Sequence, residues 1–227
     1  MNRWFAERLH GSYEQRLDIS DELYRSKTDL QDIIIFETPF FWKVLALDGI
    51  VQTTERDEAC YHEMLAHVPI LAHGDVQEAL IIGGGDGGAL REVLRHGRVD
   101  RATMVEIDRT VVDICLEHMP GLSDGAFRDP RCDLVIADGV KFVKETAHNF
   151  DLIIVDSTDP IGPSIQLFSD EFYTDCRNIL TDDGIVVCQS GVSFVQEEEA
   201  RDTLSRLTKL YTDAALYVTQ VPTYACG

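Results

Sequence analysis

The stretch IIGGGDGGALREVL, residues 81–94, surrounds one carboxylate, Asp86, with five glycines. A glycine-rich turn between a strand and a helix usually binds an anionic group through backbone N–H groups at the start of the helix. A carboxylate at the centre of such a turn repels a phosphate and attracts an ammonium group. The turn therefore predicts a site for a ligand that carries a positive charge.

Acidic residues also follow the next three apolar runs, which we expect to be strands. They are Glu106 and Asp108 in VEID, Asp138 in IADG, and Asp156 and Asp159 in DSTDPIGP. A single aspartate at a strand end often caps the following helix. Carboxylates after four successive strands favour a ligand site instead, because the carboxyl ends of parallel strands meet at the edge where such folds bind ligands.

The spacing of these residues indicates an adenosine group. Glu106 follows Gly83 at roughly the 20-residue interval at which dinucleotide-binding folds place an acid on ribose hydroxyls. Asp138 and Gly139 would lie beside the adenine, where a carboxylate accepts a hydrogen bond from the exocyclic amine. The glycine turn alone does not distinguish NAD enzymes from enzymes that use an adenosine sulfonium, but Asp86 disfavours a pyrophosphate.

Asp156 and Asp159, three positions apart, suit a metal ion, acid–base catalysis or a cationic amine. The seven histidines form neither HxxxH nor HExxH, and no phosphate loop is present, so we expect an amine site and no metal site. Residues 156–173 hold prolines and a glycine in a long segment over the ligand edge, which predicts a lid. The alternative is an ordinary strand–helix connection.

Strands and helices alternate after residue 75, and this alternation would position the acidic residues. The apolar runs are EALIIGG, ATMVEID, CDLVIADG, FDLIIVDS, GIVVCQSG and ALYVTQVPT, with helix-like segments between most of them. Continuous apolar strands between amphipathic helices predict an α/β fold with a mostly parallel, Rossmann-like sheet covered on both faces.

The sequence before residue 75 differs in texture. DIIIFETPFFWKVLALDGIVQTT holds strand-like runs broken by Thr38-Pro39 and Asp48-Gly49, which predict hairpins of a small antiparallel sheet. We therefore expect an N-terminal β-strand domain over residues 1–55 and a Rossmann-like catalytic domain over residues 56–227.

Composition narrows the classes of protein. The 227 residues include 40 acidic and 20 basic ones, for a net charge of -20, and no Lys/Arg cluster indicates nucleic-acid binding. The six cysteines form no CxxC pair, which favours reduced thiols and a cytoplasmic location. The N-terminus lacks the apolar segment of a signal peptide, and no apolar run approaches the ~18 residues of a membrane span.

Six segments in order along nearly the whole chain resemble the polyamine aminopropyltransferases, specifically the bacterial-type spermidine synthases: LDGIVQTTERDEACYHEM, IIGGGDGGALREV, VEID, DPRCDLVIADG, DSTDPIGP and PTY. The resemblance implies a β-domain joined to a class I methyltransferase-like Rossmann domain. It implies aminopropyl transfer from decarboxylated S-adenosylmethionine, a co-substrate, to putrescine, giving spermidine and methylthioadenosine. It further implies no prosthetic group and a homodimer or homotetramer.

The resemblance also implies roles for individual residues, with Asp156 as the catalytic base. The donor would be bound by Gln31, Gly83, Asp86, Glu106, Asp138, Gly139 and Pro163. The amine site would hold Tyr61, His62, Asp86, Asp156, Asp159, Gln189 and Tyr224. The family continues past PTY with a further strand and helix, whereas this chain stops at Gly227. If the protein ends there naturally, the sheet is expected to lack its final strand, and activity becomes a question for experiment.

Three other functions use a similar fold. A methyltransferase that uses intact S-adenosylmethionine on a small amine is disfavoured, because the carboxylate of that donor would approach Asp86. A nucleoside-binding protein without catalysis would not need both Asp156 and Asp159. An NAD oxidoreductase would need an anion site that the turn does not offer. Acceptors such as cadaverine, agmatine or spermidine stay open, since one methylene changes binding by only ~1–3 kcal/mol.

Overall fold

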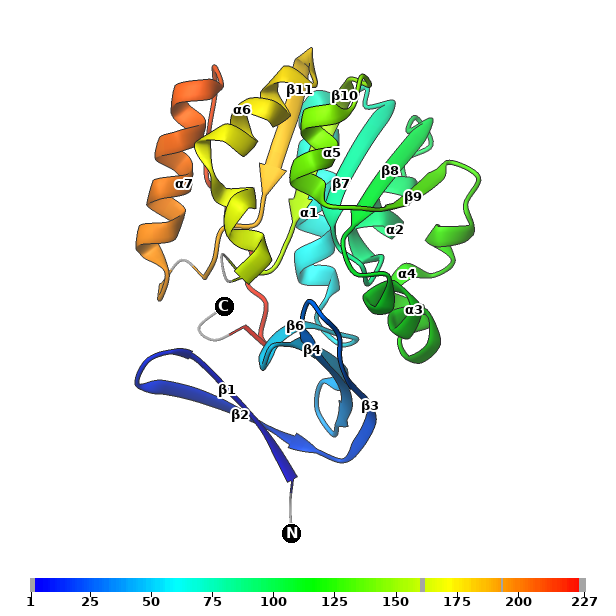
Figure 1. The fold of residues 1–227 in the computed structure, drawn as a ribbon, viewed down its shortest axis with the longest axis vertical. Coiled ribbons are helices and arrows are strands. Elements are labelled where there is room, and N and C mark those ends of the chain that lie inside the picture. The colour runs from blue at the N-terminus through cyan, green and yellow to red at the C-terminus, as the bar shows by residue number, and fades with distance from the viewer. Residues whose placement is uncertain (1–2, 160–161, 193, 225–227) are drawn as a thin grey trace.

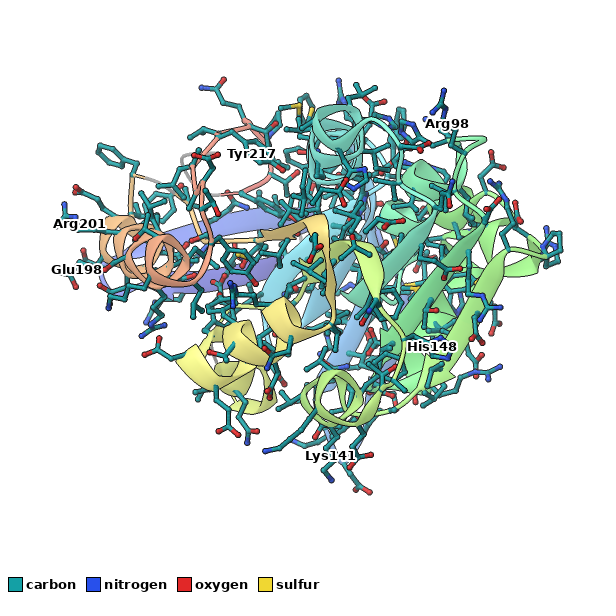
Figure 2. All side chains as sticks on the ribbon, turned by 90° about the horizontal axis from the view of Figure 1, so that it is seen from above. Arg98, Lys141, His148, Glu198, Arg201 and Tyr217 are labelled. Carbon is teal, nitrogen blue, oxygen red and sulfur yellow. The ribbon has the colours of Figure 1, made fainter. Side chains whose placement is uncertain are left out.

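The computed structural model describes residues 3–159, 162–192 and 194–224, without the side chains of residues 9, 10, 162 and 163. Antiparallel strands lie at one end of the molecule, below a parallel sheet flanked by helices (Figure 1). Seen from above, the labelled charged side chains Arg98, Lys141, Glu198 and Arg201 project outward from the rim (Figure 2).

The N-terminal strands form two antiparallel sheets. One pairs β1 (Arg3–His10) with β2 (Tyr13–Ile19); the other has the order β3 (Asp21–Lys27), β4 (Asp32–Thr38), β5 (Trp42–Leu47) and β6 (Ile50–Thr54). Asp48 and Gly49 join β5 to β6 with φ angles of 50° and 81°. Two successive positive φ values are what a type I′ hairpin turn requires, and the predicted hairpin is confirmed.

Alternating residues of the four-stranded sheet β3–β6 face two different partners. One face, which includes Ile33, Ile35 and Leu45, packs on α3 (Arg109–His118). The other face packs on β2 through Leu17. The first face thus shares a core with a helix of the C-terminal part. The predicted division at residues 55 and 56 stays a prediction.

The C-terminal part is built on a parallel sheet of five strands. In spatial order they are β11 (Leu180–Cys188), β10 (Phe150–Asp156), β7 (Glu78–Gly83), β8 (Arg101–Glu106) and β9 (Cys132–Ile136). The remaining short elements are α4 (Pro120–Ser123), η1 (Ala126–Arg128) and η2 (Gly162–Phe168). The predicted α/β class and parallel sheet are confirmed.

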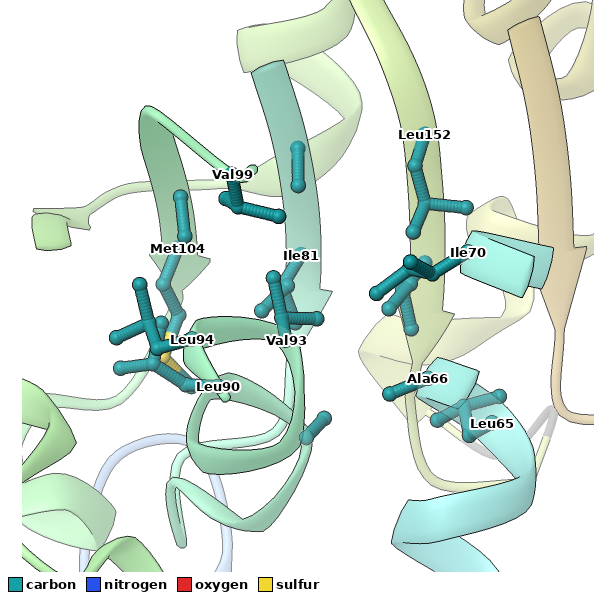
Figure 3. Close-up of a cluster of buried hydrophobic side chains, with 14 of the residues drawn as sticks. Leu65, Ala66, Ile70, Ile81, Leu90, Val93, Leu94, Val99, Met104 and Leu152 are labelled. Carbon is teal, nitrogen blue, oxygen red and sulfur yellow. The ribbon is translucent and has the colours of Figure 1, made fainter. Parts of the chain in front are cut away.

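Helices cover both faces of the parallel sheet. Side chains of α1 (Ala59–His73) and α2 (Gly88–Leu94) pack on one face around Ile81 (Figure 3). The other face packs on α5 (Gly139–Glu145), α6 (Asp170–Asn178) and α7 (Glu197–Leu210). Because both faces are buried, the strands read as continuous apolar runs. Among the described residues, no helix has the length and apolar character that crossing a bilayer requires.

The prediction of a strand in ALYVTQVPT is wrong: residues 215–223 form no strand. This segment contacts α1 through side chains instead, because Thr219 Oγ1 donates to Cys60 O at 2.7 Å and Tyr217 OH donates to Met64 O at 3.0 Å. Val218 is 66% exposed. High strand propensity produces a strand only where a neighbouring strand completes the ladder.

Candidate active site

The acidic strand ends meet around one cavity of about 1240 Å³. Asp156 and Gly83 are register partners at the carboxyl ends of β10 and β7. Twelve of the residues predicted for the site line this cavity: Gln31, Tyr61, His62, Gly83, Asp86, Glu106, Asp138, Gly139, Asp156, Asp159, Gln189 and Tyr224. Pro163 belongs to η2, but its side chain lies outside the described residues.

The glycine turn after β7 brings the backbone close to two polar side chains. A Cβ at Gly84 would lie 2.7 Å from Asp156 Oδ2, and one at Gly88 would lie 2.3 Å from the His62 ring. Asp86 Oδ1 accepts a hydrogen bond from Gly88 N at 2.6 Å and lies 3.5 Å from His62 Nε2. The turn is therefore shaped by its contacts with Asp156 and His62.

Gly88→Ala is expected to destabilise the protein by about 1–3 kcal/mol, because the added methyl group overpacks a site where the buried His62 ring has no room to retreat. The midpoint of urea unfolding measures this loss. Gly97→Ala is the matched control, since a Cβ there meets nothing within 4 Å. Equal midpoints for the two variants would contradict the close approach.

Asp156 presents one free carboxylate oxygen. Tyr61 OH donates to Asp156 Oδ1 at 2.7 Å, whereas Asp156 Oδ2 is buried and has no hydrogen-bond partner in the described part of the chain. Burial raises the pKa of Asp156 to about 6; the charge of His62 opposes this rise and that of Asp86 adds to it. A carboxylate with such a pKa and a free acceptor oxygen suits a general base near neutral pH.

Asp159 is held at another part of the cavity by two amide groups. Gln189 Nε2 donates to Asp159 Oδ1 at 2.9 Å, and Gln196 Nε2 donates to Asp159 Oδ2 at 3.1 Å. Gln196 also lines the cavity and was not predicted from the sequence, because it only precedes an acidic run typical of a helix start. Its contact with Asp159 crosses 37 positions of the chain.

Glu7 is a second cavity residue that sequence reasoning missed. It is only 5% exposed, and its Oε1 accepts from Val51 N at 2.9 Å. Burial is the main cause that raises the pKa of Glu7. The available signal was the period of two in β1, which places Glu7 on the same inward face as Phe5.

Tyr224 reaches the cavity because the end of the described chain is tied to the N-terminal strands. Tyr224 OH donates to Gln52 O at 2.6 Å, and Thr223 N donates to Asp57 Oδ2 at 2.8 Å. Gln15 Nε2 donates to Thr223 O at 2.7 Å. The ring of Tyr224 lies 6.3 Å from that of Tyr61 in an edge-on arrangement.

The remaining acidic strand ends are hydrogen-bonded to nearby backbone N–H groups, and two of them cap helices. Asp108 caps α3 by accepting from Thr110 N, and its Oδ2 accepts from Gln31 Nε2 at 3.1 Å. Asp138 caps α5 and also lines the cavity. Glu106 Oε1 accepts from Asp108 N at 2.9 Å, and burial raises the pKa of Glu106 to about 7.

Two further expectations concern the lid and a metal. Residues 160–161 of the predicted lid lie outside the described residues, and η2 follows them, so the lid stays a prediction. Across the described ranges, no three His, Cys, Asp or Glu side chains are arranged to hold a metal ion.

Family models match nearly all of this chain. Residues 58–227 match the spermine/spermidine synthase domain, and residues 3–55 match the spermidine synthase tetramerisation domain. A polyamine aminopropyltransferase of Hamiltonella defensa is 54% identical over 224 residues, which are 99% of this chain and 77% of that protein. Polyamine aminopropyltransferase 1 of Pseudomonas aeruginosa is 54% identical over 98% of this chain and 78% of its own length.

Solved structures agree with the family models. A spermidine synthase in complex with the transition-state analogue AdoDATO superposes with a TM-score of 0.94 at 39% identity, covering 99% of this chain and 78% of that one. The spermidine synthase from Thermotoga maritima gives 0.91 at 37% identity, covering 99% and 76%. The comparisons confirm the resemblance that the sequence motifs indicated, and with it the class I methyltransferase-like fold.

Proposed function

The chain belongs to the spermine/spermidine synthase family of aminopropyl-transferring enzymes, and we propose that its donor is decarboxylated S-adenosylmethionine and its acceptor is putrescine. The products are spermidine and methylthioadenosine. The observation that carries this proposal is the free, buried oxygen of Asp156 in a cavity that also holds Asp86 and Asp159. Three carboxylates suit a reaction in which both substrates carry ammonium groups.

On this proposal the donor lies along the ends of β7, β8 and β9. Glu106 accepts hydrogen bonds from the ribose hydroxyls, and Asp138 with Gly139 contacts the adenine. Asp86 pairs with the ammonium of the aminopropyl arm, while Gln31 borders the nucleoside. Burial raises the pKa of Glu106 to about 7, and in either protonation state the group keeps an oxygen that accepts from a ribose hydroxyl.

The acceptor lies between Asp156 and Asp159. Asp159, oriented by Gln189, holds one ammonium of the diamine, and the rings of Tyr61 and Tyr224 enclose its methylene chain. Burial raises the pKa of both tyrosines well above the usual value, so both hydroxyls stay protonated.

The reaction begins when the other ammonium of putrescine gives a proton to Asp156 Oδ2, because an ammonium nitrogen has no lone pair to attack with. The nearby sulfonium charge lowers the pKa of that amine. The nitrogen then attacks the methylene carbon next to sulfur in line. The C–N bond forms, the C–S bond breaks with its electron pair left on sulfur, and a neutral thioether departs. Holding the two substrates in this alignment supplies much of the acceleration.

We also propose a homodimer or homotetramer formed through residues 3–55, because they match a tetramerisation domain. Exposed aromatic rings of this part, Phe40 at 59% and Trp42 at 56%, suit such an interface.

A cytoplasmic location is a further proposal, favoured by scattered cysteines without a CxxC pair.

Mass spectrometry of the products decides the function. The purified protein, given putrescine and decarboxylated S-adenosylmethionine, is expected to form spermidine and methylthioadenosine in equal amounts. Intact S-adenosylmethionine serves as the parallel donor. Methylated putrescine would support a methyltransferase instead, and binding without any product would support a nucleoside-binding protein. Competition among putrescine, cadaverine, agmatine and spermidine then identifies the preferred acceptor.

A further inference from the structure

A row of alternating charges leads away from Asp86 into the protein. His62 Nε2 lies 3.5 Å from Asp86 Oδ1, and His62 Nδ1 lies 2.6 Å from Glu58 Oε2. Arg91 Nη2 donates to the two carboxylate oxygens of Glu58 at 3.0 Å and 2.9 Å. The side chain of His62 is 2% exposed, and those of Glu58 and Arg91 are 12% and 10% exposed.

Glu58 and Arg91 do not line the cavity, so they act on a substrate only through His62. We propose that Glu58 is a positioning residue that holds His62 as a permanent imidazolium cation beside Asp86 and Asp156. This inference rests on the proposed function for its consequence in catalysis, but the charge state of His62 is a property of the free protein.

The geometry of the imidazole ring carries the first step of the argument. Each ring nitrogen of His62 faces a carboxylate oxygen, one from Glu58 and one from Asp86. An ionised carboxylate only accepts hydrogen bonds, and a neutral imidazole has one nitrogen that donates and one that only accepts. A neutral ring would therefore turn a lone pair toward one of the two carboxylates. Only the doubly protonated ring donates on both sides.

All charged groups that face the ring favour the same state. Glu58 is the N-cap residue of α1, the helix that carries His62. Asp86 lies in the turn after β7, and Asp156 lies at the end of β10. Burial alone would lower the pKa of His62, but Asp86, Glu58 and Asp156 together raise it to about 10. Tyr61, whose ring centroid lies 5.2 Å away, stays uncharged.

Arg91 keeps Glu58 ionised at the far end of the row. Burial tends to raise the pKa of Glu58, but His62 and Arg91 lower it on balance. Arg91 is itself fixed, because Nη1 donates to Leu122 O at 2.6 Å and Nε donates to Glu92 Oε1 at 2.7 Å. The charge on Glu58 is thus built into the fold before any ligand binds.

The charge on His62 affects the pKa of Asp156, the proposed base. Asp86 raises the pKa of Asp156 and His62 lowers it, so a neutral His62 would leave two carboxylates to repel each other without compensation. The pKa of Asp156 would then rise, and less of the base would be ionised at neutral pH. Glu58 therefore sets the lower limit of the pH range over which the site works, although it touches no substrate.

Histidine-labelled protein without substrate tests the charge state by NMR. The His62 ring, assigned from the spectrum of His62→Gln, is expected to keep the nitrogen shifts of an imidazolium from pH 5 to 9. A titration near the ordinary pKa of about 6.5 would overturn the proposal. This measurement needs no activity and no variant of Glu58, so it remains decisive even if the protein makes no spermidine.

Glu58→Gln tests the link to the base. The amide keeps the shape but loses the charge, so His62 is expected to titrate within that pH range. The acid limb of kcat/KM is expected to move up by about one pH unit, which lowers the rate below the limb about tenfold. Glu58→Asp should restore both signals in part, and Glu63→Gln on the exposed side of α1 should change neither. An unchanged acid limb of kcat/KM in Glu58→Gln would overturn the positioning role of Glu58.

Discussion

Asp156→Asn is expected to lower turnover by roughly 10²–10⁴-fold, the usual scale for loss of a general base. The amide oxygen still accepts from Tyr61 OH, so the 2.7 Å hydrogen bond of Asp156 Oδ1 has a replacement. The amide nitrogen takes the place of Oδ2, which has no hydrogen-bond partner among the described residues. A nitrogen that donates cannot take the proton of an incoming ammonium.

The pH dependence separates this role from a structural one. Wild-type kcat/KM should rise with pH through about 6, because only ionised Asp156 accepts a proton and its pKa lies near that value. The variant should lose this limb while methylthioadenosine binds as before. Asp133→Asn, an exposed change in the edge strand β9 of the same sheet, is the matched control. Near-normal turnover in Asp156→Asn would show that Asp156 is not the general base.

The same variant has an expected effect on stability with a definite sign. The folded protein holds the Asp156 proton more tightly than the unfolded chain does. Ionisation of Asp156 therefore lowers the free energy of unfolding as the pH rises from 3.8, the usual aspartate pKa, through about 6. Asp156→Asn removes that cost, so at pH 8 the variant should unfold at a temperature no lower than that of the wild type. A marked loss of stability would instead indicate a structural role.

Asp86→Asn is expected to weaken binding of decarboxylated S-adenosylmethionine by about 2–5 kcal/mol, or roughly thirty- to several-thousand-fold, because one partner of a charge pair is lost. Intact S-adenosylmethionine should lose little or bind better, since its extra carboxylate no longer meets a like charge. Calorimetric titration of both donors measures the difference. The residue would thus select the donor by repelling the wrong one as well as by pairing with the right one.

The structure provides a control for the simpler possibility that Asp86 only braces the glycine turn. The hydrogen bond from Gly88 N to Asp86 Oδ1 at 2.6 Å survives in Asp86→Asn and is lost in Asp86→Ala. Methylthioadenosine has no ammonium group, so its binding should survive in Asp86→Asn and weaken only in Asp86→Ala. Equal losses of both donors in Asp86→Asn would contradict selection by charge.

The parallel sheet and its ligand edge were predictable because strands buried on both faces are continuous apolar runs, as in residues 79–82. The acidic ends of those strands then had to meet at one edge. The strand prediction for residues 215–223 was wrong, because a strand forms only beside a neighbouring strand, and the sequence does not show which segments become neighbours. Asp108 shows a related limit. It follows a strand as the site aspartates do, but its side chain caps α3, and the sequence does not distinguish the two roles.

The residues that support the site could not be predicted from the sequence, for a different reason. Gln196 reaches Asp159, and Arg91 reaches Glu58 across 33 positions. Contacts of this kind depend on how helices are placed on the sheet, which no local periodicity encodes. Glu58 looked like one acid among several before a helix, and only its distance of 2.6 Å from His62 Nδ1 distinguishes it.

The bonds that anchor Tyr224 have a consequence for the order in which the protein forms. Tyr224 bonds to Gln52, 172 positions earlier, and Thr223 bonds to Gln15, 208 positions earlier. The half of the site around the glycine turn needs the chain only as far as Asp156, at the end of β10. The half around Tyr224 needs a loop of nearly the whole chain to close, which is entropically the most costly contact. A ribosome delivers the N-terminal residues first, so the half around the glycine turn can form before the segment that holds Tyr224 has been synthesised.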